Sequence, residues 1–272
     1  MNRPGTMTIP ASVCRQISGV FFDIDDTFTY RGQIRREAFS ALWEAKEAGL
    51  LLVPITGRPA GWVDHIARMW PVDGVVGENG GFYFCIERAC GRLKKRFLIE
   101  DQAERQARLR QLYRIYAEIK SIYPAVGLAS DQPYRECDLA VDYCEDIRPP
   151  LPLEVARAIR DIFEAHGATA KISSVHVNAW IGDYDKLAMC RLFLKEEHGI
   201  CLEEQKHQYL YCGDSPNDCP MFAYFPNSAG VAGVRRFQKA GLLEHMPAYV
   251  ASRDGSYGFQ EILGGILKAR QA

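Results

Sequence analysis

The 272-residue sequence lacks an excess of charge of either sign and lacks any long hydrophobic run. Its 33 Lys+Arg residues balance 34 Asp+Glu residues, and no basic run carries interleaved aromatic residues, so nucleic acid is not expected as a partner. No segment approaches the ~18 apolar residues of a membrane helix, and the first residues contain no apolar run typical of a secretory signal. The sequence therefore predicts a soluble, cytoplasmic protein that does not bind membranes.

The nine cysteines also lack a pattern, since none lies in a CxxC pair and the closest two are Cys85 and Cys90. An odd number of cysteines, in a chain long enough to bury a core without disulfide bonds, is typical of reduced thiols. A zinc site and a catalytic cysteine are the less favoured alternatives.

Continuous apolar runs alternate with amphipathic helices at both ends of the chain. Residues 17–22, 50–55 and 74–78 are predicted to be buried strands, with helices between them, and a late strand at 209–213 leads into the loop GDSPND. Strands without polar alternation, separated by helices, are typical of a parallel sheet covered on both faces.

The middle of the chain follows another pattern. Amphipathic helices are predicted at 101–122 and 153–166, and the segments 137–143 and 171–181 alternate apolar with polar residues, as strands with one polar face do. The chain thus divides into an α/β core and an inserted α+β domain. We predict the core at residues 15–84 and 182–272 and the insert at 85–181.

Polar clusters follow the predicted core strands. Since ligands of a parallel sheet bind at the carboxyl ends of its strands, these clusters are candidates for one common site. Several carboxylates there would repel one another without a cation, and Mg²⁺ is favoured because it takes a few oxygen ligands and keeps its remaining waters. Capped turns are the structural alternative. The clusters are Asp23, Asp25 and Asp26; Thr56, Gly57 and Arg58; and Asp214, Ser215, Asn217 and Asp218.

Four segments, FFDIDDTFT, PITGR, DYDKL and GDSPND, resemble in this order the four motifs of the haloacid-dehalogenase superfamily of phosphotransferases. The long interval between the second and third motifs, together with ENGG after the third strand, is similar to the type IIB capped branch, which includes Cof-like hydrolases and sugar-phosphate phosphatases. The resemblance implies a Rossmann-like core with a type IIB cap.

The resemblance also implies roles for individual residues. Asp23 would be the nucleophile that takes up the phosphoryl group, and Asp25 would be the general acid and base. Thr56, Gly57 and Lys186 would bind the phosphoryl oxygens. The residues implied to hold Mg²⁺ are Asp23, Asp25 through its carbonyl, Asp214 and Asp218, with Thr27, Arg58 and Asn217 in support. Many members carry glycine at the position of Asp26, and the resemblance implies no role for that carboxylate.

Substrate contacts are predicted on segment 171–181. Its apolar face should pack on the helices of the insert, and its polar face should look towards the active site, where it would suit a polyhydroxylated ligand; a solvated sheet face is the alternative. The apolar residues are Val175, Val177, Ala179 and Ile181, and the polar residues are Ser174, His176, Asn178 and Trp180. Arg135 is a weaker candidate of the same kind.

These features predict a Mg²⁺-dependent phosphatase for a small phosphorylated metabolite, most readily a sugar phosphate. A phosphomutase resembling phosphomannomutase is the alternative. A phospho-receiver module is disfavoured because receivers are far shorter and lack the insert. A dinucleotide-binding enzyme is disfavoured because no GxGxxG follows the first strand. The motifs leave the identity of the substrate and the oligomeric state open.

Overall fold

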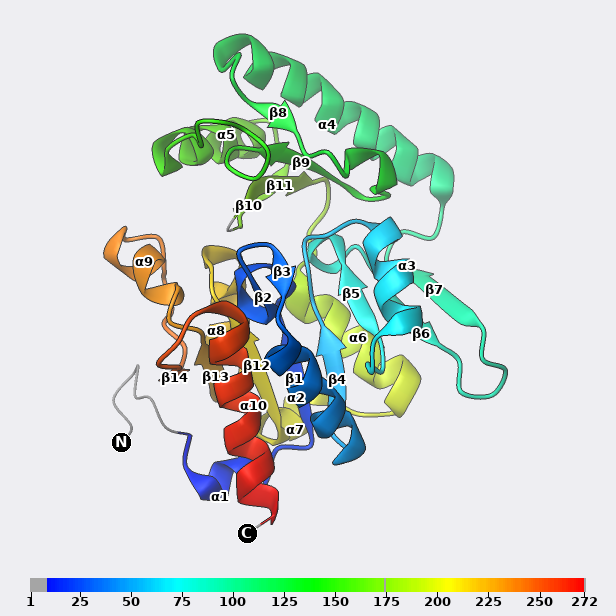
Figure 1. The fold of residues 1–272 in the computed structure, drawn as a ribbon. Helices are drawn as coiled ribbons and strands as arrows, with labels where there is room; N and C mark the ends of the chain where they lie inside the picture. The colour runs from blue at the N-terminus through cyan, green and yellow to red at the C-terminus, as the bar shows by residue number, and fades with distance from the viewer. Residues whose placement is uncertain (1–8, 174, 272) are drawn as a thin grey trace.

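The computed structural model describes residues 9–173 and 175–271. At its centre lies a five-stranded sheet in which all neighbouring strands run parallel, as predicted from the apolar runs (Figure 1). In sheet order the strands are β14 (Tyr249–Val250), β13 (Asn227–Gly230), β12 (Tyr209–Gly213), β1 (Gly19–Phe22) and β4 (Leu51–Pro54).

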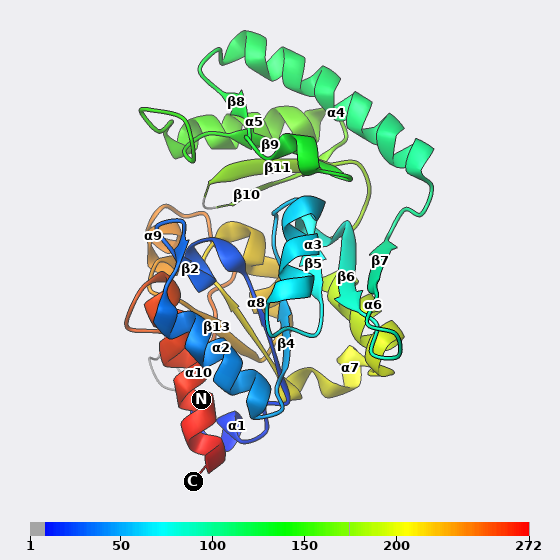
Figure 2. The ribbon, with the colours of Figure 1, turned by 45° about the vertical axis from the view of Figure 1, so that its right-hand side comes forward.

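Helices cover both faces of this sheet, which explains why its strands are apolar throughout (Figure 2). Val20 and Phe22 of β1 pack under α2 and α10, whereas Phe21 between them packs on the opposite face under α6 and α8. The helices of the core are α1 (Ala11–Cys14), α2 (Arg36–Glu47), α6 (Lys186–His198), α7 (Leu202–Gln205), α8 (Cys219–Tyr224), α9 (Val234–Lys239) and α10 (Gly255–Gln271).

Short elements join these helices and strands. They are the π-helical turn η1 (Ile24–Phe28), the 3₁₀ turns η2 (Glu78–Gly80), η3 (Gln132–Tyr134), η4 (Lys206–Gln208) and η5 (Pro216–Asp218), and the hairpin of β2 (Thr29–Tyr30) with β3 (Gln33–Ile34).

A second, antiparallel sheet continues from the core edge. It consists of β5 (Val75–Gly77), β6 (Phe82–Ile86) and β7 (Leu93–Phe97), and α3 (Ala60–Met69) packs against it. A bridge between Ile55 and Val76 links it to the end of β4. Strand β6 crosses residue 85, where we placed the start of the insert. The predicted division of the chain into domains stays a prediction.

Residues 102–180, which we call the cap, form an α+β layer over the core. Its four-stranded antiparallel sheet has the order β10 (Thr169–Ile172), β11 (His176–Trp180), β9 (Asp138–Asp142) and β8 (Gly127–Leu128). Helices α4 (Gln102–Ile122) and α5 (Leu153–Ala165) cover the outer face, so the sheet lies between these helices and the core (Figures 1 and 2). As predicted, Val177 and Ala179 pack under the two helices.

The single strand that we predicted over 171–181 is wrong, because the segment turns back on itself. Strands β10 and β11 pair antiparallel, with Ile172 opposite Val177. Ser173 closes the turn: its amide donates to the carbonyl of His176 at 2.8 Å, and its Oγ accepts from the amide of His176 at 2.9 Å. The alternation of polar and apolar residues continues through this turn and hides it. Ser174, predicted on the polar face, lies outside the described residues.

Within the described residues, no helix is both long enough and apolar enough to cross a membrane.

Candidate active site

Three carboxylates converge at the carboxyl ends of β1 and β12. Asp23 directly follows β1, Asp214 directly follows β12, and Asp218 lies in η5 four residues beyond Asp214. All three are buried, and each offers an oxygen within 4.8 Å of those of the others. The parallel sheet thus brings together the residues of the first and fourth motifs, which are remote in sequence.

The cluster holds more negative charge than its surroundings balance. Burial, followed by the charges of Asp218 and Asp25, raises the pKa of Asp23 to about 8 against the attraction of Lys186. Burial and the charges of Asp23 and Asp218 raise the pKa of Asp214 well above its usual range. Oxygen Oδ2 of Asp214 is buried and accepts no hydrogen bond from the described residues. A buried carboxylate oxygen that accepts no hydrogen bond, in an all-oxygen cluster, fits a hard divalent cation such as Mg²⁺.

Asp218 has a different place in this cluster. Its Oδ2 accepts from the amides of Asp214 and Ser215 at 3.0 and 3.1 Å, and its Oδ1 accepts from Tyr211 and from Lys186. Gly213 permits this arrangement, since a Cβ there would lie 2.4 Å from Asp218 Oδ2. Asp218 therefore orients the loop that carries Asp214, whereas Asp214 Oδ2 accepts no hydrogen bond from the described residues and lies 3.6 Å from Arg236 Nη2.

Lys186 supplies the buried positive charge of the site. Its Nζ lies 2.7 Å from Asp23 Oδ1 and 2.7 Å from Asp218 Oδ1. Burial alone would lower the pKa of Lys186, but the charges of Asp218 and Asp23 raise it. Lys186 is the first residue of α6, and the side chain of Asp185 caps this helix by accepting from the amide of Ala188 at 2.8 Å. Asp185 thus fixes the residue at which α6 begins, and this helix start directs the side chain of Lys186 towards the carboxylate cluster.

The loop after β4 lies beside the cluster. Thr56 is fully buried, and its Oγ1 accepts from the amide of Arg58 at 3.0 Å. Gly57 leaves little room for a side chain, because a Cβ would lie 3.2 Å from Nδ2 of Asn79. Thr27 donates to Asp214 Oδ1 at 3.3 Å and so contacts the carboxylate cluster. The structure therefore places the second motif next to the first and fourth.

Arg58 connects the acidic core loop to the cap. Its Nε and Nη2 each lie 2.8 Å from one oxygen of Asp25, and its Nη1 donates to Asp131 at 3.2 Å and to Glu145 at 3.1 Å. The guanidinium also stacks over Trp62 at 4.6 Å. Asp131 and Glu145 were not identified from the sequence, because neither residue lies in one of the four motifs. For Glu145, the available signal was the acidic run after the strand that contains Asp142.

Glu78 of the ENGG segment is a second connection between core and cap. It is fully buried, and its carboxylate accepts from the amide of Ala60 in the core and from the amides of Glu136, Cys137 and Asp138 at the start of β9. Burial and the charge of Asp138 raise its pKa to about 8. The ENGG segment therefore anchors the cap to α3.

A small cavity of about 10 Å³ lies at the seam between core and cap. His176 and Asn178 thus face Asp23 and Asp25, on the side where the polar face of the strand was predicted. His176 Nε2 lies 2.8 Å from Glu145, and Asn178 donates to Asp138 at 3.1 Å. The cavity is lined by Asp23, Asp25, Gly57, Arg58, Ser173, Val175, His176, Asn178, Ser215 and Asn217.

The other two predicted substrate contacts are not among the residues that line this cavity. Trp180 is 1% exposed, and its Nε1 donates to the carbonyl of Tyr184 at 3.1 Å. Arg135 is held by Asp131 and Asp138 and donates to the carbonyl of Gly57 at 2.8 Å. Arg135 therefore supports the loop of the second motif.

No family model matches the sequence, and no curated protein does. Solved structures do match over nearly the whole chain. A putative haloacid-dehalogenase/Cof-like hydrolase from Plasmodium vivax is 18% identical, with a TM-score of 0.65 and coverage of 96% of this chain and 98% of its own.

Two sugar phosphatases are similar as well. The sucrose-phosphatase of Synechocystis, solved with sucrose and phosphate, is 17% identical with a TM-score of 0.60, and covers 93% of this chain and 98% of its own. A subclass IIB sugar phosphatase of the haloacid-dehalogenase superfamily is 14% identical, with the same TM-score and the same coverages. This chain therefore shares its fold with solved haloacid-dehalogenase hydrolases, among them a subclass IIB sugar phosphatase.

Proposed function

We propose that this protein is a Mg²⁺-dependent phosphatase that hydrolyses a small phosphorylated metabolite, most readily a sugar phosphate. The observation that carries the proposal is the position of Asp23. Its carboxylate lies 2.7 Å from the Lys186 ammonium and within 4.8 Å of a carboxylate oxygen of Asp214, and it lines the seam cavity together with Asp25 and Gly57. A nucleophile, a cation, a proton donor and a metal-binding oxygen therefore share one site.

The chemistry follows from these positions. An oxygen of Asp23 attacks phosphorus while the bond to the leaving oxygen breaks, and Asp25 gives that oxygen its proton. Water then attacks the aspartyl-phosphate, Asp25 accepts the proton of the water, and inorganic phosphate leaves with Asp23 restored. Lys186 and Thr56 bind the phosphoryl oxygens during both steps. Mg²⁺, held by Asp23, Asp214 and the carbonyl of Asp25, would neutralise charge on those oxygens.

The seam must open to admit a substrate. A cavity of about 10 Å³ accepts roughly one water molecule. Arg58 occupies both oxygens of Asp25 in this arrangement, so the leaving group has to displace the guanidinium before Asp25 can donate a proton to it. Substrate therefore requires both a wider seam and the release of Asp25 from Arg58.

A sugar phosphate is favoured as the substrate by the polar side chains above the site. The imidazole of His176 and the amide of Asn178 line the cavity with Arg58, and all three can form hydrogen bonds to hydroxyl groups. Two proteins of the same fold are described as sugar phosphatases, which supports the same class here.

The test is a phosphate-release screen over sugar phosphates, phosphoglycolate, nucleotides and pyridoxal phosphate, with Mg²⁺ and with EDTA. Asp23→Asn should lose activity by at least about 10³-fold on every substrate, because an amide cannot form the aspartyl-phosphate. Asp161→Asn, a change of an exposed carboxylate on α5, is the matched control and should retain activity.

Turnover by Asp23→Asn in the presence of Mg²⁺ would contradict the proposal. Transfer of phosphate to a sugar hydroxyl without release of inorganic phosphate would instead indicate a mutase.

A further inference from the structure

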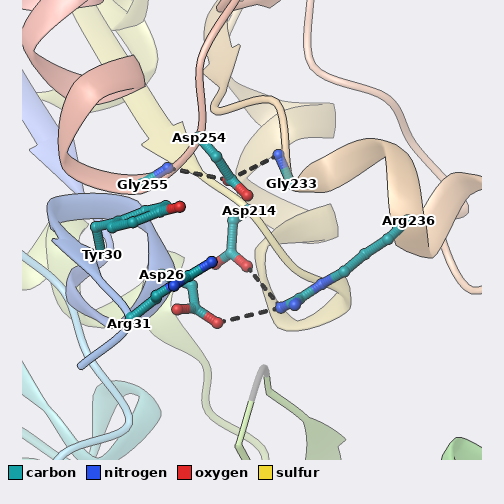
Figure 3. A pocket seen from close by; sticks show the side chains of 8 residues that line it. All are labelled: Asp26, Tyr30, Arg31, Asp214, Gly233, Arg236, Asp254 and Gly255. Carbon is teal, nitrogen blue, oxygen red and sulfur yellow. Dashed lines mark hydrogen bonds and ion pairs between the residues drawn. The ribbon is translucent and has the colours of Figure 1, made fainter.

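A polar cavity of about 340 Å³ borders the carboxylate cluster on its outer side. Asp214 is a member of both, so the cavity opens directly onto a proposed metal ligand. Figure 3 shows Arg236 reaching from α9 across this cavity towards Asp26 and Asp214. The cavity is lined by Asp26, Tyr30, Arg31, Asp214, Gly233, Arg236, Asp254 and Gly255.

The guanidinium of Arg236 contacts two carboxylates at once. Its Nη2 lies 3.2 Å from Asp26 Oδ2 and 3.6 Å from Asp214 Oδ2. Asp214 is 1% exposed, and this oxygen is the one that accepts no hydrogen bond from the described residues. Arg236 therefore places its positive charge beside the Asp214 oxygen that would ligate Mg²⁺ under the proposed function.

Mg²⁺ and the guanidinium compete for this oxygen, because two cations a few ångström apart repel each other. Arg236 is free to withdraw. Its side chain is 53% exposed, so moving it buries no charge. The backbone at the start of α9 can stay in place, since Asp254 accepts from the amide of Gly233 at 2.9 Å.

The cavity also has room for the change. A volume of 340 Å³ corresponds to roughly ten water molecules at about 30 Å³ each. That space suffices for the waters that Mg²⁺ keeps and for a displaced guanidinium. Asp26, already 3.2 Å from Arg236, offers the guanidinium a partner in its new position.

Asp26 lies in the loop after β1 at a position with a positive φ angle. Its φ is +56°, in the left-handed region, where aspartate and asparagine are tolerated better than most residues other than glycine. Its amide donates to Thr29 Oγ1 at 3.0 Å, which fixes the loop. A glycine would adopt this backbone without strain, so the backbone does not require the carboxylate, which accepts a hydrogen bond from Arg236.

We propose that Arg236 is a counter-ion that competes with Mg²⁺ for Asp214, and that Asp26 holds Arg236 once the metal is bound. The inference rests on the metal dependence in the proposed function. The two residues then set the affinity for Mg²⁺ in opposite directions. Arg236 weakens binding because it must be displaced, and Asp26 strengthens binding because it receives the displaced cation.

The test is a double-mutant cycle read by isothermal titration of the full chain with Mg²⁺, without substrate. Arg236→Gln should tighten Mg²⁺ binding by about threefold to fivefold, the range expected for a partly exposed ion pair. Asp26→Asn should weaken it by a similar factor, and asparagine keeps the left-handed backbone. In the Arg236→Gln background, Asp26→Asn should have little effect, because no cation remains for it to hold. Arg236→Lys keeps the charge and should stay near the wild type.

If Asp26→Asn changed the affinity for Mg²⁺ by the same factor in the wild-type and Arg236→Gln backgrounds, the inference would be overturned, because charges that act only at long range give additive changes. Weaker Mg²⁺ binding by Arg236→Gln would overturn it as well, and that result does not depend on the folding of the Asp26 variant. Absence of Mg²⁺ binding by the wild type would overturn the metal dependence of the proposed function together with this inference. Mg²⁺ binding with an additive cycle would overturn the inference alone.

Discussion

The guanidinium of Arg58 holds both carboxylate oxygens of Asp25, with Nε and Nη2 each 2.8 Å from one oxygen. The same guanidinium contacts Asp131 and Glu145 of the cap. Because Asp25 is the proposed proton donor, this one side chain couples proton transfer to the position of the cap. A planar group with five donors is suited to such a role, since it can serve several carboxylates at once.

Arg58→Lys should therefore lower both activity and stability. An ammonium is a point charge that cannot hold two oxygens of Asp25 and reach the cap carboxylates together. We expect kcat/KM to fall by about tenfold or more and the free energy of unfolding to fall by roughly 1–3 kcal/mol, because buried carboxylates lose hydrogen bonds. Steady-state kinetics and urea unfolding measure the two effects.

Arg68→Lys is the matched control, since Arg68 lies on the neighbouring helix α3 with an exposed side chain paired to Asp64. It should change stability by less than about 0.5 kcal/mol and leave the kinetics unchanged. If the Arg58→Lys variant had the same kinetics as the wild type, Arg58 would not control proton transfer by Asp25.

Glu145 should make stability depend on pH. Burial alone would raise its pKa, but the close contacts with His176 and with the Arg58 guanidinium lower it from 4.5 to about 2. A carboxylate with a lowered pKa in the folded state stabilises the protein fully above its unfolded pKa. The contribution is lost as pH falls from about 4.5 towards 2.

The corresponding variant is Glu145→Gln. It should reduce the free energy of unfolding by about 1–3 kcal/mol at pH 7, where the wild-type carboxylate is ionised. The difference from the wild type should stay constant down to about pH 5 and then shrink. Urea unfolding at a series of pH values measures it, with the exposed Glu47→Gln as control. A difference that stays the same from pH 7 to pH 3 would refute the assignment.

Two residues of β11 should affect catalysis differently. His176 lines the cavity beside Asp23, whereas Trp180 is buried and donates to the carbonyl of Tyr184. His176→Ala should raise KM several-fold for the best substrate, because a hydrogen-bonding group at the cavity is lost. Trp180→Phe should cost about 1 kcal/mol of stability through its lost hydrogen bond and leave KM unchanged. An equal rise of KM in both variants would place Trp180 in the substrate site after all.

The parallel sheet and the positions of the polar motifs along it could be predicted from the residue pattern. Strands such as β1 and β4 are buried on both faces, so hydrophobic burial leaves continuous apolar runs that identify them. Parallel strands end at one edge, and this geometry alone brings Asp23 and Asp214 together. The turn at Ser173 was missed because polar alternation is the same in one long strand and in a tight hairpin.

The pairing of remote polar side chains became visible only in the folded chain. Arg58 and Glu145 lie 87 residues apart, and Arg135 and Gly57 lie 78 apart, so no local pattern records either contact. The same holds for Arg236 and Asp26, which are 210 residues apart and meet because α9 and η1 border the same cavity. The pattern of apolar burial follows the periodicity of helices and strands and can be recognised along the chain. Pairing of buried charges depends on the distance and direction between groups, and these exist only once the elements of the chain are packed together.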